Sequence, residues 1–171
     1  MGKQSMIEIA GLMPYTGEWT KEQAAHLLRR TTIGPGKQMI DEAVDRGLHE
    51  TVSLLLSDID LPQPPINYVF EDDPDVPIGE TWIDSPHTPE VLGYRRRSLV
   101  AWTMENILTE VDSAREKMVL FWHNHFPIAQ TLDPRYEYIY SNTLRANAFG
   151  NFRELVKNIT LDPAMLRYQI G

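Results

Sequence analysis

Residues 113–127 read SAREKMVLFWHNHFP, a stretch that indicates how the chain folds and also contains its densest cluster of polar and aromatic side chains. Ser113 and Glu116 have the spacing of a capping box, in which the two side chains satisfy free backbone N–H groups at a helix start. Pro127 cannot continue a helix and disfavours helical geometry at the preceding residue, so we expect this helix to end near His125.

Helix signals of the same kind recur on both sides of this stretch. Gly47 follows apolar residues at helical spacing and is expected to end their helix. Neither the alternation typical of strands nor a hairpin signal occurs in the sequence. We therefore predict an all-α fold, a multi-helix, bundle-like single domain over residues 1–171. The expected helices cover about 21–30, 35–46, 48–56, 89–110, 113–125 and 134–149, with two more that begin after Asn151 and Asp162.

Residues 58–88, DIDLPQPPINYVFEDDPDVPIGETWIDSPHT, interrupt this helical pattern. The segment contains eight Asp and Glu residues and no Lys or Arg, so it accounts for the whole net charge of −8. It also contains six of the twelve prolines, which exclude a regular helix. We predict a long, irregular acidic loop or lid, since loops of this length are uncommon unless they have a function or are disordered.

Three interpretations of the acidic segment are open. It is a solvated excursion that Tyr68, Phe70 and Trp82 fasten to the body, or a lid or arm that docks a protein partner with Trp82 as its anchor. A calcium loop over 71–75 is the third, but the sequence lacks the glycine and the glutamate that a helix–loop–helix calcium site has at its sixth and twelfth positions.

The composition narrows the class of protein. A length of 171 residues fits one domain, and the absence of cysteine excludes disulfides and thiolate metal sites. The acidic balance predicts no nucleic-acid partner, and no apolar run approaches the roughly 18 residues of a membrane span. The first residues, MGKQSMIEIAGLMPYTG, lack the pattern of a signal peptide, which favours the cytoplasm by default.

Three histidines are candidates for a metal site. His123 and His125 lie at a helix end that Pro127 terminates, and a neutral imidazole is a common metal ligand. On a regular helix these two residues point about 200° apart, so both reach one ion only if the helix unwinds there. With His26 they would complete a three-nitrogen set of the kind that holds catalytic Zn²⁺ or another divalent metal. The alternative is structural: a histidine that complements the helix dipole or packs among aromatic side chains.

Two basic clusters supply candidates for anion binding. They are Arg29-Arg30 and 95–97, from which we take Arg29 and Arg97 as the candidate residues. An arginine can grip a carboxylate or a phosphate with two parallel hydrogen bonds. The alternative is that the arginines pair with the acidic segment or with neighbouring helices.

Four stretches resemble motifs of a bacterial family, the domain of unknown function 1800 family. They follow in the same order as in the family and span residues 20–168. The four are AAHLLRRTTIGP at 24–35, REKMVLFWHNHF at 115–126, LR at 144–145 with GNFREL at 150–155, and DPAMLRY at 162–168. Ile33 stands where the family is expected to prefer phenylalanine.

The resemblance implies that this chain is the N-terminal part of a longer protein, because members of the family continue into further helical segments. An active site completed by such segments would be only partly present here. The resemblance implies no agreed activity, and it allows export, since many members are exported.

Two functional hypotheses follow. In the first, the chain is a helical scaffold or interaction module, the segment WHNHF at 122–126 is a core cluster, and the acidic segment docks a protein partner. In the alternative, the chain is the N-terminal part of a histidine-ligated, metal-dependent enzyme, with hydrolysis by a metal-activated water as the first expectation.

Overall fold

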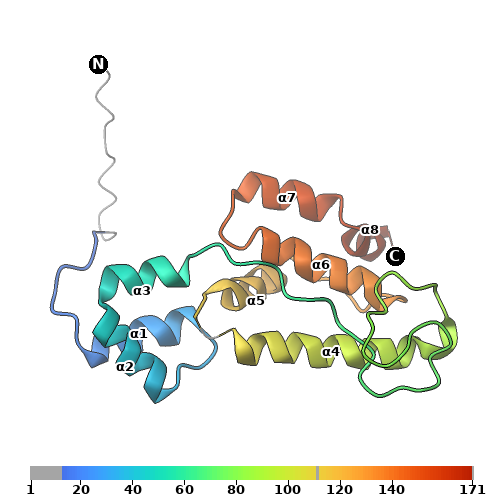
Figure 1. The fold of residues 1–171 in the computed structure, drawn as a ribbon. Coiled ribbons are helices and arrows are strands. Elements are labelled where there is room, and N and C mark those ends of the chain that lie inside the picture. The colour runs from blue at the N-terminus through green and yellow to red at the C-terminus, as the bar shows by residue number, and fades with distance from the viewer. Residues whose placement is uncertain (1–12, 111, 171) are drawn as a thin grey trace.

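The computed structural model describes residues 13–110 and 112–170. Within these residues the chain forms eight α-helices, one short 3-10 helix and no strand, which confirms the all-α prediction (Figure 1). The helices are α1 (Lys21–Thr31), α2 (Lys37–Arg46), α3 (Leu48–Leu55), α4 (Leu92–Thr109), α5 (Arg115–His125), α6 (Pro134–Ala146), α7 (Phe152–Thr160) and α8 (Pro163–Ile170), with η1 at Pro89–Val91.

The last three helices have side-chain N-caps at the predicted residues. Asp133 accepts a hydrogen bond from the backbone N–H of Arg135 at 3.0 Å at the start of α6. Asn151 does the same at the start of α7, and the carboxylate of Asp162 accepts from the N–H of Ala164 at 2.9 Å. These side chains replace the partners that the first N–H groups of a helix lack.

Two helix starts differ from the prediction. The helix expected from residue 89 begins as the 3-10 turn η1, and the hydroxyl of Thr88 binds the carboxylate of Asp75 instead of capping the backbone. Helix α5 begins one residue later than its capping box implies, because Ala114 occupies the N-cap and the Ser113 hydroxyl accepts from the N–H of Arg115. Glu116 is therefore rotated away from the capping position, a shift that matters for the site below.

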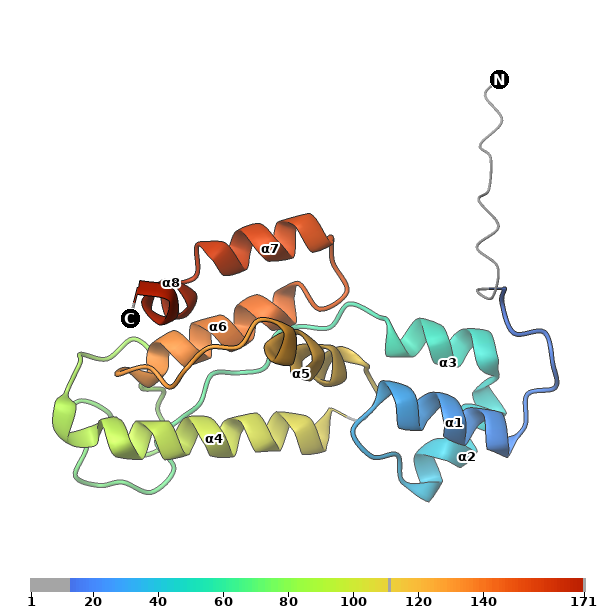
Figure 2. The same cartoon turned by 180° about the vertical axis from the view of Figure 1, so that it is seen from behind.

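The helices form two groups, which follow one another along the long direction of the molecule (Figures 1 and 2). Helices α1–α3 pack around a small core at one end, and Ala114 connects this core to α5 because its N–H donates to the carbonyl of Leu55. Helices α4–α8 form the other group, with a core of apolar residues from α5 to α8. That core contains Val119, Tyr140, Leu144, Leu155, Ile159, Ala164 and Met165.

The segment between α3 and η1 runs along the second group to the far end of α4 (Figure 2). It shares a third apolar cluster with α4, in which Val76 and Trp82 pack against Leu99 and Trp102. None of the helices in the described ranges combines the length and the apolar character that crossing a bilayer requires.

Candidate functional site

A groove of about 340 Å³ is bounded by α4, α5 and α6. Its walls are mainly apolar, and we call it the apolar groove. Its wall residues are Leu99, Val100, Met104, Ile107, Val119, Leu120 and Ile128. The polar residues that line it are Thr103, Glu116, His123, Gln130, Glu137, Tyr140, Ser141 and Arg145. A mainly apolar cavity with a few convergent polar groups is the usual form of a binding site.

The most deeply buried charges of the groove are Glu116 and Arg145, which are 4% and 3% exposed. Arg145 donates from Nε at 2.6 Å and from Nη2 at 2.9 Å to the two carboxylate oxygens of Glu116. Its Cζ lies 4.5 Å from the centroid of the Trp102 ring, a cation–π contact. Arg145 Nη1 has no hydrogen-bond partner in the described residues, so the indole face is what compensates that side of the guanidinium.

Glu116 was expected to cap α5, and that expectation is wrong. With Ala114 at the N-cap, Glu116 is the second residue of the helix rather than the third, which turns its side chain by about 100°. It then faces α6 instead of the free N–H groups. The pair with Arg145 was missed because the two residues are 29 positions apart in the sequence. The available signal was that both belong to motifs of the family resemblance.

Tyr140 contributes a hydroxyl that is not free for chemistry. The side chain is fully buried, and its OH donates to the carbonyl oxygen of Phe126. Burial, together with the nearby charge of Asp162, raises the pKa of Tyr140 to about 12. The phenol therefore stays protonated near neutral pH and acts as a hydrogen-bond donor.

The structure separates the three candidate metal ligands. His123 is exposed at the edge of the groove, where its ring centroid lies 6.0 Å from that of Tyr140. His125 lies on the other side of the same regular helix, among Phe121, Trp122 and Phe126. His26 is exposed on α1, next to Trp19 and Leu27 in a separate cavity.

No group of three or more His, Asp or Glu side chains among residues 13–110 and 112–170 lies close enough to hold a metal ion. A metal site at His26, His123 or His125 therefore needs ligands from outside the described part, and it stays a prediction. The expectation that the segment 122–126 is a core cluster is wrong. His123, Asn124 and His125 are exposed, and only Trp122 and Phe126 are partly buried.

The candidate anion-binding arginines are both exposed. Arg29 borders the same cavity as His26, and the Arg97 guanidinium lies 5.9 Å from the centre of the Tyr94 ring. Neither arginine forms an ion pair within the described ranges. The alternative was that the arginines pair within the protein. Arg95 and Arg96 do so, with Asp73 and Glu137.

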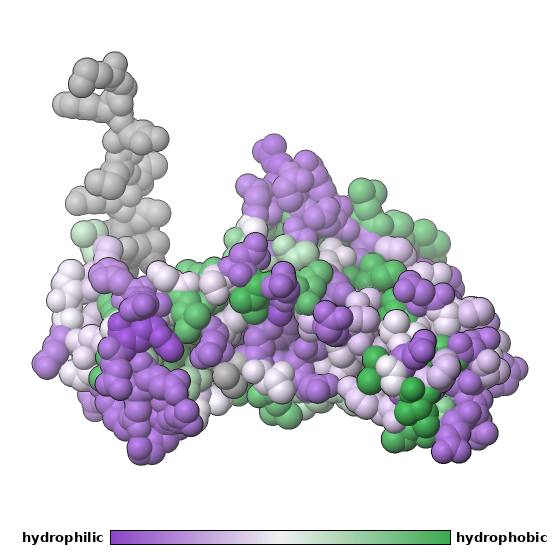
Figure 3. Space-filling model, viewed as in Figure 1, coloured by the Kyte–Doolittle hydropathy of each residue, from purple (hydrophilic) through white to green (hydrophobic). Residues whose placement is uncertain are grey.

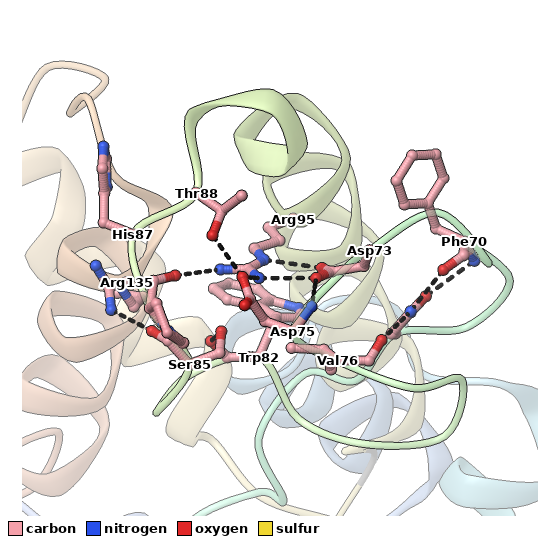
Figure 4. Close-up of polar contacts among 12 residues, drawn as sticks. Phe70, Asp73, Asp75, Val76, Trp82, Ser85, His87, Thr88, Arg95 and Arg135 are labelled. Atoms are coloured by element: carbon pink, nitrogen blue, oxygen red, sulfur yellow. Dashed lines mark hydrogen bonds and ion pairs between the residues drawn. The ribbon is translucent and has the colours of Figure 1, made fainter.

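Within the cluster 95–97, Arg95 is the residue that binds the acidic segment (Figure 4). Its Nε and Nη2 each donate at 3.0 Å to the carboxylate of Asp73, and both side chains are almost fully buried. Its Nη1 donates to the carbonyl of Pro86 at 2.8 Å. Burial tends to raise the pKa of Asp73, but the hydrogen bonds from Arg95 more than offset this and hold that pKa below its usual value.

Trp82 is fully buried and fastens the segment to α4. Its Nε1 donates to the hydroxyl of Ser98 at 3.0 Å, and that hydroxyl donates to the carbonyl of Ile66 at 2.7 Å. Phe70 stacks on Tyr94 with ring centroids 4.7 Å apart. The interpretation of Trp82 as the anchor for a partner is therefore wrong, because the body of the protein already encloses it.

The end of the segment is tied to α6 through Asp133. His87 and Arg135 both contact the carboxylate of Asp133, His87 at 2.9 Å from Nδ1, and Arg135 also donates to the carbonyl of Ser85 at 2.6 Å. Burial raises the pKa of Asp133, yet the hydrogen bonds from Arg135 and His87 outweigh it and bring that pKa down to about 2.

These features define a class: an all-helical domain with an apolar groove over a buried Glu–Arg pair, and an acidic segment clamped along one helix. A family model described as "Protein of unknown function (DUF1800)" matches residues 26–168. Since this match covers most of the 171 residues, the chain belongs to that family. Searches of curated proteins and of solved structures gave no match.

Proposed function

We propose that this domain is a protein-interaction module whose contact surface is the apolar groove together with the outer face of α4. The outer face of α4 is the side turned away from the core, and it consists of Arg97, Val100, Ala101, Met104, Glu105 and Leu108. The two parts are continuous, because Val100 and Met104 belong to both.

The observation that supports the proposal is that α4 and α5 have apolar side chains on both of their sides. Leu99 and Trp102 of α4 face inward, whereas Val100, Met104 and Leu108 are 59%, 49% and 69% exposed. On α5, Val119 is buried, but Leu120 and Phe121 are about half exposed. In Figure 3 hydrophobic side chains also lie along the lower edge of the molecule, below α4 and over the loops of the acidic segment at its right-hand end, whereas α2 and α7 are mainly hydrophilic. A helix that is apolar on both sides is normally covered on both sides.

The polar groups of the groove favour binding over catalysis. Both carboxylate oxygens of Glu116 are occupied by Arg145, and Tyr140 donates to a backbone carbonyl. General acid–base chemistry needs groups whose pKa lies near the working pH, and the pKa of Tyr140 is far above it. Among the ionisable residues that line the groove, His123 is the exposed one.

Site-specific photo-cross-linking in the producing cells tests the proposal. A benzoylphenylalanine in place of Met104 or Leu120 should give discrete adducts to polypeptide, which mass spectrometry then assigns. The same group in place of Thr160, an exposed residue of α7, is the matched control. Equal labelling at all three positions, or none at the two groove positions, would contradict an interaction surface.

The alternative function is a metal-dependent enzyme to which this chain contributes histidines. Its support is the position of His123 at the edge of the groove that Glu116 also lines. Elemental mass spectrometry of protein purified without a histidine tag tests it. Stoichiometric zinc or another divalent metal that is lost in His123→Ala would support the enzyme, and metal-free protein in both samples would show that this chain does not hold a metal by itself.

A further inference from the structure

We infer that the partner of the outer face of α4 is a second copy of this chain, packed with its own α4 antiparallel across a two-fold axis near Ala101. The inference rests on the proposed function, since it names the partner of the same surface. A two-fold interface brings the same patch of both copies together, so the patch must be complementary to itself. The outer face of α4 meets this condition in shape and in charge.

The shape condition is met by one small residue in an apolar row. Ala101 is exposed in the middle of α4, with the apolar Val100 and Met104 beside it toward the groove and Leu108 one turn beyond Met104. A small residue at a crossing point lets two helix backbones approach closely, while the larger neighbours fill the space beside it. Val100, Met104 and Leu108 on this side of the helix are 59%, 49% and 69% exposed.

The charge condition is met by Arg97 and Glu105. Arg97 lies four residues before Ala101 and Glu105 four residues after it, and both are exposed. An antiparallel partner reverses the order, so Arg97 of each copy lies beside Glu105 of the other. The symmetry forms this ion pair twice.

Both charges are available for such a pair. Arg97 contacts only the Tyr94 ring, at 5.9 Å, and forms no ion pair in the part of the chain that is described. Glu105 accepts one hydrogen bond at Oε2, from the Tyr68 hydroxyl at 2.9 Å, which leaves Oε1 to a partner. Arg95 and Arg96, by contrast, are already paired with Asp73 and Glu137. In the cluster 95–97, Arg97 is therefore the arginine that an external carboxylate can reach.

Charge reversal tests the inference with the full chain in sedimentation velocity and light scattering over a range of concentrations. The unmodified protein should form dimers. Arg97→Glu and Glu105→Arg should each weaken dimerisation about tenfold or more, because each reversal places like charges together at two symmetric positions. The double variant R97E/E105R should restore it, since the swapped charges attract again. Arg153→Glu, at an exposed position of α7, should leave it unchanged.

Circular dichroism of every variant separates lost dimerisation from lost folding. An unmodified protein that stays monomeric at all concentrations overturns the inference, as does a double variant that stays as weak as the single ones. A monomeric chain whose groove positions still cross-link to a different polypeptide would reject the second copy and keep the interaction module. Absence of both dimers and groove adducts would reject the two proposals together.

Discussion

The acidic segment 58–88 and the face formed by α4 and α5 both differ from what their sequences suggest: the segment is anchored by buried side chains, and the helices expose apolar ones. The segment has the charge and proline content of a free arm, but Trp82, Asp73 and Asn67 in it are buried. Helices α4 and α5 have the apolar spacing of ordinary core helices, but Met104 and Leu120 are about half exposed. Exposed apolar side chains therefore occur on the regular helices as well as in the irregular segment, although the residues that anchor the segment are buried.

This difference between the segment and the helices shows what proline content, charge and apolar spacing each indicate about packing. Proline and charge exclude regular secondary structure, yet they do not decide whether a segment is packed against the body. In this segment a buried ion pair and a buried indole are among the contacts that hold it along α4. On the helices, an excess of apolar residues over what one buried stripe needs is the signal of a second contact.

The largest expected effect comes from removing the ion pair that holds the segment. Arg95→Met keeps most of the side-chain volume but leaves the buried carboxylate of Asp73 without its partner. We expect a loss of about 3–5 kcal/mol in the free energy of unfolding, which urea denaturation measures. Arg97→Met, two residues away and exposed, is the control and should change that free energy by less than about 0.5 kcal/mol.

Equal effects of the two substitutions would show that the segment is not held by Arg95. The double variant R95M/D73N refines the result. It removes the unpaired charge, so part of the lost stability should return if the cost comes from a buried carboxylate.

Most of the fold follows from local signals, and most of the site does not. Caps such as Asp133 and Asn151 act within two residues, so the sequence predicts them correctly. The pair of Glu116 with Arg145 depends on a one-residue shift at the start of α5 and on a helix 29 positions away. The side of His123 on α5 was predictable from the helical period, but the exposure of His26 was not, because it depends on what packs against α1.

The second prediction concerns pH and the end of the acidic segment. The pKa of Asp133 is about 2 in the folded protein and near 4 in an unfolded chain, so its charge stabilises the fold above pH 4. That contribution, about 2 kcal/mol, should disappear as the pH falls from about 4 to about 2. Asp133→Asn should lose it at every pH.

A second buried carboxylate, Asp162, also titrates in this pH range, so the effect of Asp133 must be measured as a difference between the Asp133→Asn variant and the unmodified protein. Burial raises the pKa of Asp162, so its protonation on acidification favours the folded state and works against the effect of Asp133. The measurement is therefore the difference in unfolding free energy between the Asp133→Asn variant and the unmodified protein from pH 7 to pH 2. A difference that does not shrink below pH 4 would show that Asp133 is not the group responsible.

A smaller effect is expected from the indole that fastens the segment. Trp82→Phe keeps an aromatic ring in the buried site but removes the hydrogen bond from Nε1 to the Ser98 hydroxyl. We expect a loss of about 1–2 kcal/mol in thermal or urea unfolding, because the remaining hydroxyl of Ser98 still donates to the Ile66 carbonyl. Ser98→Ala should then cost less in the Trp82→Phe background than in the unmodified protein, because this hydrogen bond is already absent there. A loss close to that of Arg95→Met would mean that ring packing, and not the hydrogen bond, dominates.

The smallest expected change in stability comes from substitutions on the α4–α5 face, and it tests most directly whether this face differs from the acidic segment. Met104→Gln and Leu120→Gln alter the face formed by α4 and α5, where both side chains are about half exposed. If this face is a contact surface for a partner, each substitution should change the unfolding free energy of the monomer by less than about 0.5 kcal/mol and yet reduce cross-linking at the groove. A loss of more than about 2 kcal/mol would instead show that these side chains belong to the core of the single chain. The same reasoning separates the two regions: the segment 58–88 should affect folding before binding, and the α4–α5 face should affect binding before folding.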